Sequence, residues 1–273
     1  MRQDSDKQPN GILTKAGLHE SQTKLNLALG SLNMASLRLT VVKLLQQTKL
    51  NKIAHKIYYN YFHGFNTATK EVVPAIEIAF QKAMELGIVN NGDYYEFGLF
   101  KGYAFWHAQK TANKYGLKKM RFFGFDSFRG LPKVQGKDET KEEVFYEGQY
   151  ACSKDQVTKN LSAKGVDWSK TFLIEGFFED SLKEQTKEKY QMGKVAIALI
   201  DCDLYSSTSE VLRFIKDLIT DNTILIFDDW NCFDRDDEKG QRKAFREFLE
   251  KNKQLAAEEL FEYGIYGQAF LIK

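Results

Sequence analysis

VAIALIDCDLYSS, at residues 195–207, is an apolar run that ends in two aspartates, Asp201 and Asp203. An unbroken apolar run of this length is typical of a strand buried on both faces, as in a parallel sheet. An aspartate that directly follows such a strand can be read in two ways. It can cap the next helix, or it can belong to a ligand site at the end of the sheet.

Four similar runs surround this stretch, and helical patterns separate them. The runs are DYYEFG (93–98), MRFFGFD (120–126), TFLIEG (171–176) and TILIFDD (223–229), with helices expected near 104–115, 155–164 and 208–220. Short strands that alternate with helices predict an α/β fold with a parallel sheet and right-handed crossovers. After a last helix near 241–252, ELFEYG (259–264) and QAFLIK (268–273) predict a closing antiparallel hairpin. The sheet is therefore expected to be mostly parallel.

The pattern along the chain divides it into three regions. Residues 1–23 are polar and are expected to form a mobile leader. Residues 24–89 show helical spacing and are expected to form a lid, a homodimer surface or both. The turn NNGD at 90–93 opens the third region, 90–273, which holds all the predicted strands. This third region is the expected ligand-binding and catalytic domain.

The composition excludes several classes of protein. With 39 basic and 37 acidic residues the net charge is +2, which argues against a nucleic-acid partner. The three cysteines lack metal-ligand spacing. Their small, odd number indicates a reducing compartment and no disulfide framework. No apolar run approaches the about 20 residues of a membrane span, and the N-terminus lacks the apolar core of a secretory signal. A cytoplasmic protein with no membrane partner is expected.

Every predicted parallel strand has an acidic residue at or near its carboxyl end. These residues are Glu96, Asp126, Glu175, Asp201 with Asp203, and Asp228 with Asp229. Because the carboxyl ends of parallel strands share one edge of the sheet, the acids are expected to gather where ligands bind. Carboxylates gathered at a partly buried edge repel one another unless protons, a metal ion or a cationic ligand compensates. Such compensation is therefore expected at this edge.

The segment after the first strand, EFGLFKG (96–102), resembles a nucleotide-binding turn without the full GxGxxG fingerprint. Gly98 allows a tight turn and the close approach of a ligand. Asp126 can accept both hydroxyls of a ribose or cap its own turn, and Glu96 can meet an amino group. A ribose, an amino-acid end and a sulfonium suit an acidic edge better than an anionic pyrophosphate does. S-Adenosylmethionine meets this description, and the aromatic residues that can pack on it, or simply fill the core, are Phe100, Tyr103, Phe128 and Phe178.

Five motifs occur along the chain in the order EFGLFKG, FFGFDSFRGLP, LIEGFFEDSL, ALIDCDLYSST and ILIFDDW. In this order they resemble the macrocin O-methyltransferase (TylF-type) family, from about residue 90 to the C-terminus. The resemblance implies a class I methyltransferase (Rossmann-like) sheet with a helical N-terminal lid. It also implies a metal-dependent enzyme that uses S-adenosylmethionine, and several members of the family methylate sugar hydroxyls on antibiotics.

The resemblance assigns roles to the acidic residues that end the last two parallel strands. It implies that Asp201, Asp228 and Asp229 bind the metal. An all-oxygen ligand set favours Mg²⁺, with Mn²⁺ or Ca²⁺ as alternatives. It further implies a general base at Asp203, a residue that can also be read as the cap of the helix beginning near Ser206.

The cofactor-binding residues are expected on the other strand ends. GFFEDSL (176–182) is expected to contact adenine through Phe178 and Asp180, although Asp180 can equally cap a short helix. His107 is interpreted as a structural residue of a helix, and His55 and His63 as packing residues rather than acceptor contacts. The full cofactor-binding set is Glu96, Gly98, Gly102, Tyr103, Asp126, Ser127, Phe178, Asp180 and Asp201.

We therefore expect an S-adenosylmethionine-dependent O-methyltransferase that acts with a divalent metal on a hydroxyl of a small molecule or glycoside, in particular a sugar. One alternative is a glycosyltransferase, because a D-x-D motif can hold a metal on a nucleotide sugar; the EFG turn and Asp126 serve no diphosphate. Another is a catalytically silent protein that binds the cofactor as an assembly partner, although such a protein need not keep the acids. The sequence does not identify the acceptor, whose pocket is expected between the N-terminal helices and the 128–152 loop.

Overall fold

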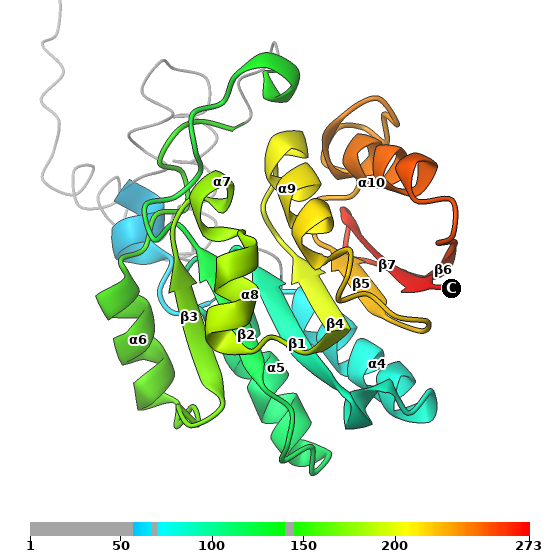
Figure 1. Ribbon diagram of the computed structural model, residues 1–273. Helices are drawn as coiled ribbons and strands as arrows, with labels where there is room; N and C mark the ends of the chain where they lie inside the picture. Colours follow the sequence, from blue (N-terminus) through cyan, green and yellow to red (C-terminus); the bar gives the residue numbers. More distant parts are fainter. Residues whose placement is uncertain (1–56, 67–69, 140–144) are drawn as a thin grey trace, which may run out of the picture. The chain divides into compact units, whose positions relative to one another are not determined.

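A seven-stranded sheet forms the centre of the computed structural model, which describes residues 57–66, 70–139 and 145–273 (Figure 1). The strand order is β3-β2-β1-β4-β5-β7-β6, in which the first five strands are parallel and β7 is antiparallel to both its neighbours. The order and the closing hairpin confirm the predicted mostly parallel α/β sheet. The strands are β1 (Gly92–Phe97), β2 (Phe122–Asp126), β3 (Thr171–Glu175), β4 (Lys194–Ile200), β5 (Ile224–Phe227), β6 (Ala257–Tyr263) and β7 (Gly267–Ile272).

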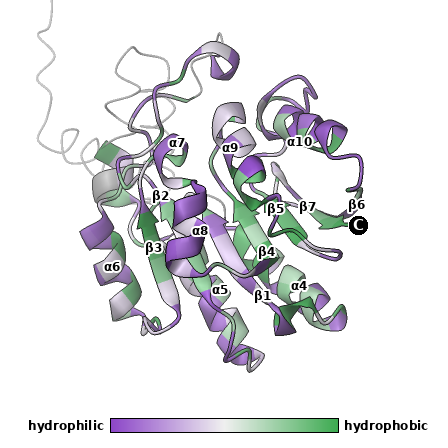
Figure 2. Ribbon diagram, viewed as in Figure 1, coloured by the Kyte–Doolittle hydropathy of each residue, from purple (hydrophilic) through white to green (hydrophobic). Residues whose placement is uncertain are grey.

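Helices cover both faces of the sheet because successive strand residues point to opposite sides. Tyr94 packs in one buried cluster with residues of α4 (Val72–Glu85), α5 (Tyr103–Lys114) and α6 (Lys154–Ala163). Tyr95 and Phe97 belong to the cluster on the other face. The helices of that face are α7 (Phe178–Ser181), α8 (Glu184–Tyr190), α9 (Tyr205–Ile215) and α10 (Gly240–Lys251). In Figure 2, β3, β4 and β5 are largely hydrophobic, whereas α6, α8 and α10 are largely hydrophilic.

Several element boundaries differ from those expected. The strand expected over 223–229 ends at Phe227, so that Asp228 and Asp229 lie just beyond it. The helix expected over 208–220 begins at Tyr205 and ends at Ile215. α8 is a short helix that follows Asp180, as the capping interpretation of that residue expected, but Asp180 lies within α7 and α8 has no side-chain cap. The remaining short elements are η1 (Tyr58–Phe62), a π-helix, and the 3₁₀ helices η2 (Ile88–Asn90) and η3 (Gly136–Asp138).

Most of the N-terminal prediction falls outside the described residues. The leader 1–23 and the helices expected before η1 are not described, so the lid and the homodimer surface stay predictions. Only Val72–Glu85 of the expected N-terminal helices is described at its full length, as α4. Within the described part of the chain, no helix is long and apolar enough to cross a membrane.

Candidate active site

A cavity with a volume of about 370 Å³ lies at the carboxyl ends of the parallel strands. Its wall combines the turn after β1 with the ends of β2, β4 and β5 and with the loop that follows β2. Eleven residues singled out from the sequence line it together: Glu96, Gly98, Phe100, Tyr103, Asp126, Ser127, Phe178, Asp201, Asp203, Asp228 and Asp229. The expected gathering of acids is thus present in the fold except for Glu175, which is exposed, pairs with Lys154 and lies outside the cavity lining.

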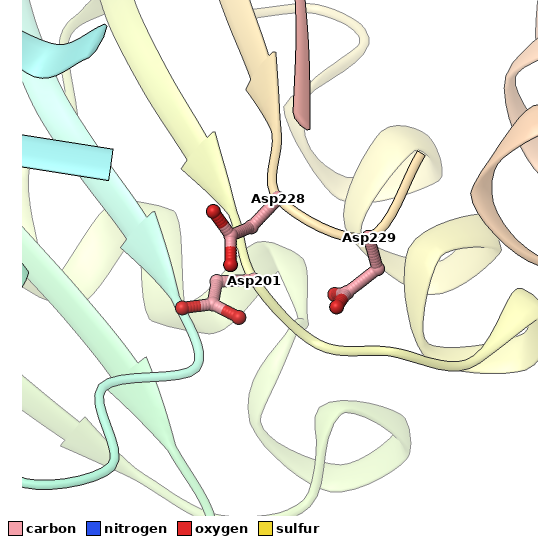
Figure 3. Close-up of side chains that lie close together, drawn as sticks. All are labelled: Asp201, Asp228 and Asp229. Atoms are coloured by element: carbon pink, nitrogen blue, oxygen red, sulfur yellow. The ribbon is translucent and has the colours of Figure 1, made fainter. Parts of the chain in front are cut away.

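Three of these acids can share one ion. One carboxylate oxygen from each of Asp201, Asp228 and Asp229 lies within 4.8 Å of the others. Figure 3 shows Asp201 and Asp228 close together, with Asp229 beside them on the loop after β5. Burial, followed by the negative charges of Asp228 and Asp229, raises the pKa of Asp201 well above its ordinary value. Burial raises the pKa of Asp229 to about 6.

Two residues that the sequence did not single out hold these acids in place. The Tyr263 hydroxyl donates to Asp228 Oδ1 at 2.9 Å, from the end of β6. Its ring passes over β7 at Gly267, where an added Cβ would lie 2.2 Å from Tyr263 Cζ. Gln241 is fully buried, accepts from the Asp229 N–H at 3.0 Å and donates to the Ile200 carbonyl at 2.9 Å. Gln241 therefore ties the end of β4 to the loop after β5.

Asp203 lies in the cavity wall with a backbone that few side-chain-bearing residues adopt. Its φ is 60°, in the left-handed region, and its N–H donates to Asp229 Oδ2 at 2.9 Å. The side chain that caps α9 is a different one, because Asp138 Oδ1 accepts from the Ser206 N–H at 3.2 Å. Asp138 belongs to η3, in the loop after β2. The cap interpretation of Asp203 thus loses its support, whereas its role as a base stays a prediction.

The two glycines of the first turn are required by neighbouring protein atoms. Gly98 has a φ of 90°, and an added Cβ would lie 1.8 Å from the Asp201 carbonyl oxygen. Gly102 has a φ of 82°, and its Cβ would meet Val157 and Leu161 of α6 at 3.2 and 3.1 Å. Gly98 is therefore required by the close approach of the Asp201 backbone, and because Gly98 also lines the cavity, the approach of a ligand there stays a prediction. Gly102 does not line the cavity, because α6 covers it.

Asp126 supports the same turn through its side chain. Its Oδ2 accepts from the N–H groups of Leu99 and Phe100 at 2.7 and 3.1 Å. Its Oδ1 accepts from the Phe128 N–H at 2.6 Å, which is the capping of its own turn that the sequence left open. Burial raises the pKa of Asp126, and these three backbone hydrogen bonds oppose the rise. A ribose bound here would share a carboxylate that already organises the turn.

Glu96 is the most deeply placed acid of the cavity, with 1% of its surface exposed. The Tyr94 hydroxyl donates to its Oε2 at 2.7 Å. Burial raises the pKa of Glu96 to about 8, because desolvation disfavours the charged carboxylate. The side chain is therefore largely protonated at neutral pH until a cation approaches it.

The sequence model of the macrocin-O-methyltransferase (TylF) family matches residues 73–263 of the chain. The chain belongs to this family. Residues 73–263 include the first turn, the acids of the cavity and Tyr263. The resemblance drawn from the five sequence motifs is thereby confirmed.

Two curated relatives of this TylF-family chain are named for sugar methylation. One is the 8-demethyl-8-(2,3-dimethoxy-alpha-L-rhamnosyl)-tetracenomycin-C 4'-O-methyltransferase of Streptomyces olivaceus, 24% identical over 143 residues, or 51% of this chain and 53% of the relative. The other is the mycinamicin III 3''-O-methyltransferase of Micromonospora griseorubida, 25% identical over 145 residues, or 51% of this chain and 55% of the relative. The chain spans about half the length of these relatives in the matches.

Solved structures share the fold of the TylF-family chain. The O-methyltransferase NovP superposes with a TM-score of 0.64 at 16% identity, covering 86% of this chain and 98% of NovP. The calicheamicin methyltransferase CalS11 gives a TM-score of 0.58 at 17% identity, covering 98% of this chain and 99% of CalS11. These neighbours confirm the class I methyltransferase sheet that the motifs implied.

Two other predicted residues of this family member lie apart from the cavity lining. Asp180, in α7, is exposed and outside the lining, whereas Phe178 of the same helix lines the cavity. His107 packs in α5 against the rings of Tyr103 and Trp106, and burial lowers its pKa. His107 does not line the cavity, in agreement with its interpretation as a structural residue. His55 falls outside the described residues.

The loop after β2 contributes residues of both its described flanks to the cavity. Its two described flanks pair, because the Leu131 N–H donates to the Gln149 carbonyl and the Gly148 N–H to the Leu131 carbonyl, each at 2.9 Å. This pairing brings Gln149 and Tyr150 into the cavity wall. The sequence FYEGQY (145–150) gave no signal of a backbone pairing across so long a loop. The prediction that this loop builds part of the pocket is nevertheless supported.

Proposed function

We propose that the chain is an S-adenosylmethionine-dependent O-methyltransferase that methylates a sugar hydroxyl with the help of a divalent metal ion. The observation that carries the proposal is the charge of the cavity. Its aspartate and glutamate lining residues, Glu96, Asp126, Asp201, Asp203, Asp228 and Asp229, can carry only negative charge. Among the described residues, no lysine, arginine or histidine lines it. Such a wall suits a sulfonium, an amino group and a metal cation, and it opposes phosphates.

The same charge argues against the glycosyltransferase alternative. A nucleotide sugar would bring a diphosphate next to several carboxylates, and a single metal ion would have to compensate both. The backbone N–H groups of the turn after β1 are also used within the protein. Those of Leu99 and Phe100 donate to the side chain of Asp126, at the end of β2. These N–H groups are therefore not available to a bound phosphate, as the N–H groups of a phosphate-binding turn would be.

The proposed metal ligands are Asp201, Asp228 and Asp229, and their chemistry fits the ion. Three hard oxygen donors within 4.8 Å of one another match the preference of Mg²⁺ for carboxylates. Desolvation and mutual repulsion raise the pKa of Asp201, and a cation would relieve this repulsion. Tyr263 and Gln241 orient the ligand loop through hydrogen bonds, as the supporting residues of metal sites do.

When bound, S-adenosylmethionine supplies the methyl group from its sulfonium, and a divalent ion supplies the Lewis acidity that lowers the pKa of a bound hydroxyl. Asp203 is proposed to receive the hydroxyl proton, since its carboxyl lines the cavity beside the ligand set. Burial and the charges of Asp229 and Asp228 raise the pKa of Asp203 in the metal-free chain, and a bound cation would oppose this rise and favour the ionised carboxylate that a base requires. Asp126 and Glu96 are proposed to bind the ribose and the amino group of the cofactor.

The relatives support a sugar hydroxyl as the methyl acceptor. Both curated relatives are named for O-methylation of a sugar carried by a natural product. Because the matches span about half of each relative, the acceptor class of this chain is a proposal. Two neighbouring hydroxyls of a sugar ring could both approach the acidic cluster, which is the template function of a metal site.

The proposal is tested by titrating S-adenosylhomocysteine into the metal-stripped protein, with and without Mg²⁺, and by measuring transfer of labelled methyl groups to glycosides. Asp228→Asn should keep cofactor binding and lose the Mg²⁺ dependence of transfer, while the exposed control Asp221→Asn should behave as wild type. Binding of a nucleotide sugar without binding of S-adenosylhomocysteine would support the glycosyltransferase alternative. Cofactor binding without transfer to any glycoside would support the silent alternative.

A further inference from the structure

Three aromatic rings from distant parts of the chain meet at one side of the cavity. They are Tyr59 of η1, Phe100 of the first turn and Tyr150 at the end of the loop after β2. The ring centroids are 5.7 Å apart for Tyr59 and Phe100, 5.0 Å for Tyr59 and Tyr150, and 5.8 Å for Phe100 and Tyr150. We call this group the aromatic corner. Phe100 and Tyr150 line the cavity directly.

The fold holds the aromatic corner in place at some cost in backbone energy. Phe100 and Tyr150 have φ values of 48° and 59°, in the left-handed region that residues with a side chain rarely adopt. Such backbones are retained where the surroundings impose them, and they are frequent at functional sites. Lys101 Nζ donates to the Tyr59 carbonyl at 2.6 Å and ties η1 to the first turn.

The shape of the aromatic corner selects against a flat ligand. Its three ring pairs have interplanar angles of 84°, 73° and 72°, so no two of the rings are parallel. A planar aromatic ligand gains most when it stacks between parallel faces. A corner of mutually perpendicular rings has faces and edges in several directions, and it suits the C–H groups that a puckered pyranose ring projects from one side.

The charge of the cavity restricts the ligand further. The acids of the wall would repel a phosphate or a uronate, and among the described lining residues there is no cation to compensate them. The Tyr150 phenol lies within the field of Asp203 and Asp229, and burial together with these charges raises its pKa well above its ordinary value. Like other phenols it is neutral at physiological pH; it forms a side-chain hydrogen bond with Tyr59, and it can donate to a sugar oxygen in exchange for that bond.

We propose that the aromatic corner is the acceptor subsite and that it selects an uncharged pyranoside over a nucleotide sugar or a planar catechol. Tyr150 is the specificity-determining residue, because it joins the corner to the acids around Asp203. The inference rests on the proposed function and deepens it, since it specifies the class of acceptor and the wall that binds it.

The test is saturation-transfer difference NMR on the full chain loaded with S-adenosylhomocysteine. The probes are methyl α-L-rhamnopyranoside, thymidine diphosphate rhamnose and catechol, each alone and in competition. We expect saturation of the ring C–H protons of the methyl rhamnoside and weaker signals from the other two. Tyr150→Ala should raise the dissociation constant of the pyranoside about tenfold, which corresponds to 1.4 kcal/mol. Tyr150→Phe, which keeps the ring, should raise it less.

Two controls separate the outcomes. Tyr190→Ala removes another half-buried tyrosine, at the end of α8 and outside the cavity lining, and should leave pyranoside binding unchanged. Binding of S-adenosylhomocysteine by every variant shows that the fold and the cofactor half are intact. If the wild-type chain does not bind S-adenosylhomocysteine, the proposed function fails. Two outcomes would refute the acceptor subsite alone, provided that the wild-type chain binds S-adenosylhomocysteine. In one, catechol or the nucleotide sugar outcompetes the pyranoside; in the other, Tyr150→Ala binds the pyranoside as wild type does.

Discussion

Tyr263→Phe is the most direct test of the proposed metal site, because it removes one oxygen atom and leaves all three carboxylates unchanged. In the wild-type chain the Tyr263 hydroxyl donates to Asp228 Oδ1 at 2.9 Å. Tyr263 is 8% exposed and Asp228 is 5% exposed, so water cannot readily replace the lost donor. The Asp228 carboxylate of the variant would lose the donor that orients it.

The size of the effect follows from the chemistry of this hydrogen bond. A hydrogen bond to a charged group contributes about 1.5–3 kcal/mol, and each 1.4 kcal/mol corresponds to about a factor of ten in affinity. Loss of a residue that orients a metal ligand typically weakens metal binding by about 10–100-fold. Both routes predict that Tyr263→Phe weakens binding of a divalent ion by about 10–100-fold, with little change in the binding of S-adenosylhomocysteine.

The assay is a titration of the metal-stripped chain with Mn²⁺, followed by the electron paramagnetic resonance signal of the free ion. Tyr115→Phe is the matched control, because it removes a phenol that donates to Glu77 at 3.2 Å outside the cavity. The control should bind Mn²⁺ as wild type does. A Tyr263→Phe variant that is folded and binds Mn²⁺ within about twofold of wild type would refute the positioning role. Absence of Mn²⁺ binding by the wild-type chain would refute the metal site itself.

Three further predictions concern stability. Gly98→Ala should lower the free energy of unfolding by more than about 3 kcal/mol, since its Cβ would lie 1.8 Å from the Asp201 carbonyl oxygen; unchanged denaturation would contradict this. Asp138→Ala removes the acceptor of the Ser206 N–H and should lower the free energy of unfolding by about 1 kcal/mol, or the Tm by about 2–4 °C. Asp138→Asn, which keeps an acceptor oxygen, should restore most of this stability. The pKa of Glu96 is raised from 4.5 to about 8 in the folded chain, so its contribution to stability is present below pH 4.5 and is lost as the pH rises through 8. Glu96→Gln should flatten this fall in denaturation of the metal-free chain, and an unaltered pH profile would exclude the raised pKa.

The central sheet and the position of its ligand edge could be predicted because both depend on local patterns. Each apolar run is long enough for one strand, and parallel strands place their carboxyl ends on one side. Asp201 and Asp228 therefore come together from the pairing of β4 with β5, in which Ile200 lies opposite Phe227. The acids that follow two adjacent strands could be expected to meet before their geometry was known.

The supporting residues could not be predicted because they act across the strand order. Tyr263 reaches Asp228 over 35 residues of sequence, and it does so only because Gly267 leaves room above β7. Asp138 caps α9 from a loop that begins at a different strand. No spacing rule links such pairs, since the loop lengths and the insertion of β7 between β5 and β6 decide which atoms meet. The first turn is a related case, because the sequence did not show that Gly98 also accommodates the backbone of Asp201, from a distant strand end.

The place of β7 has a consequence for the smallest chain that could function. The match to the family ends at residue 263, whereas β7 spans Gly267–Ile272 and separates β5 from β6 in the sheet. A chain cut after residue 263 would retain every acid of the cavity and also Tyr263. It would nevertheless leave β6 without the strand that aligns it, and the Tyr263 hydroxyl could not be held at Asp228. The family match therefore ends before the proposed catalytic unit does. If the proposal holds, β7 is as necessary to the enzyme as the residues that would bind its metal.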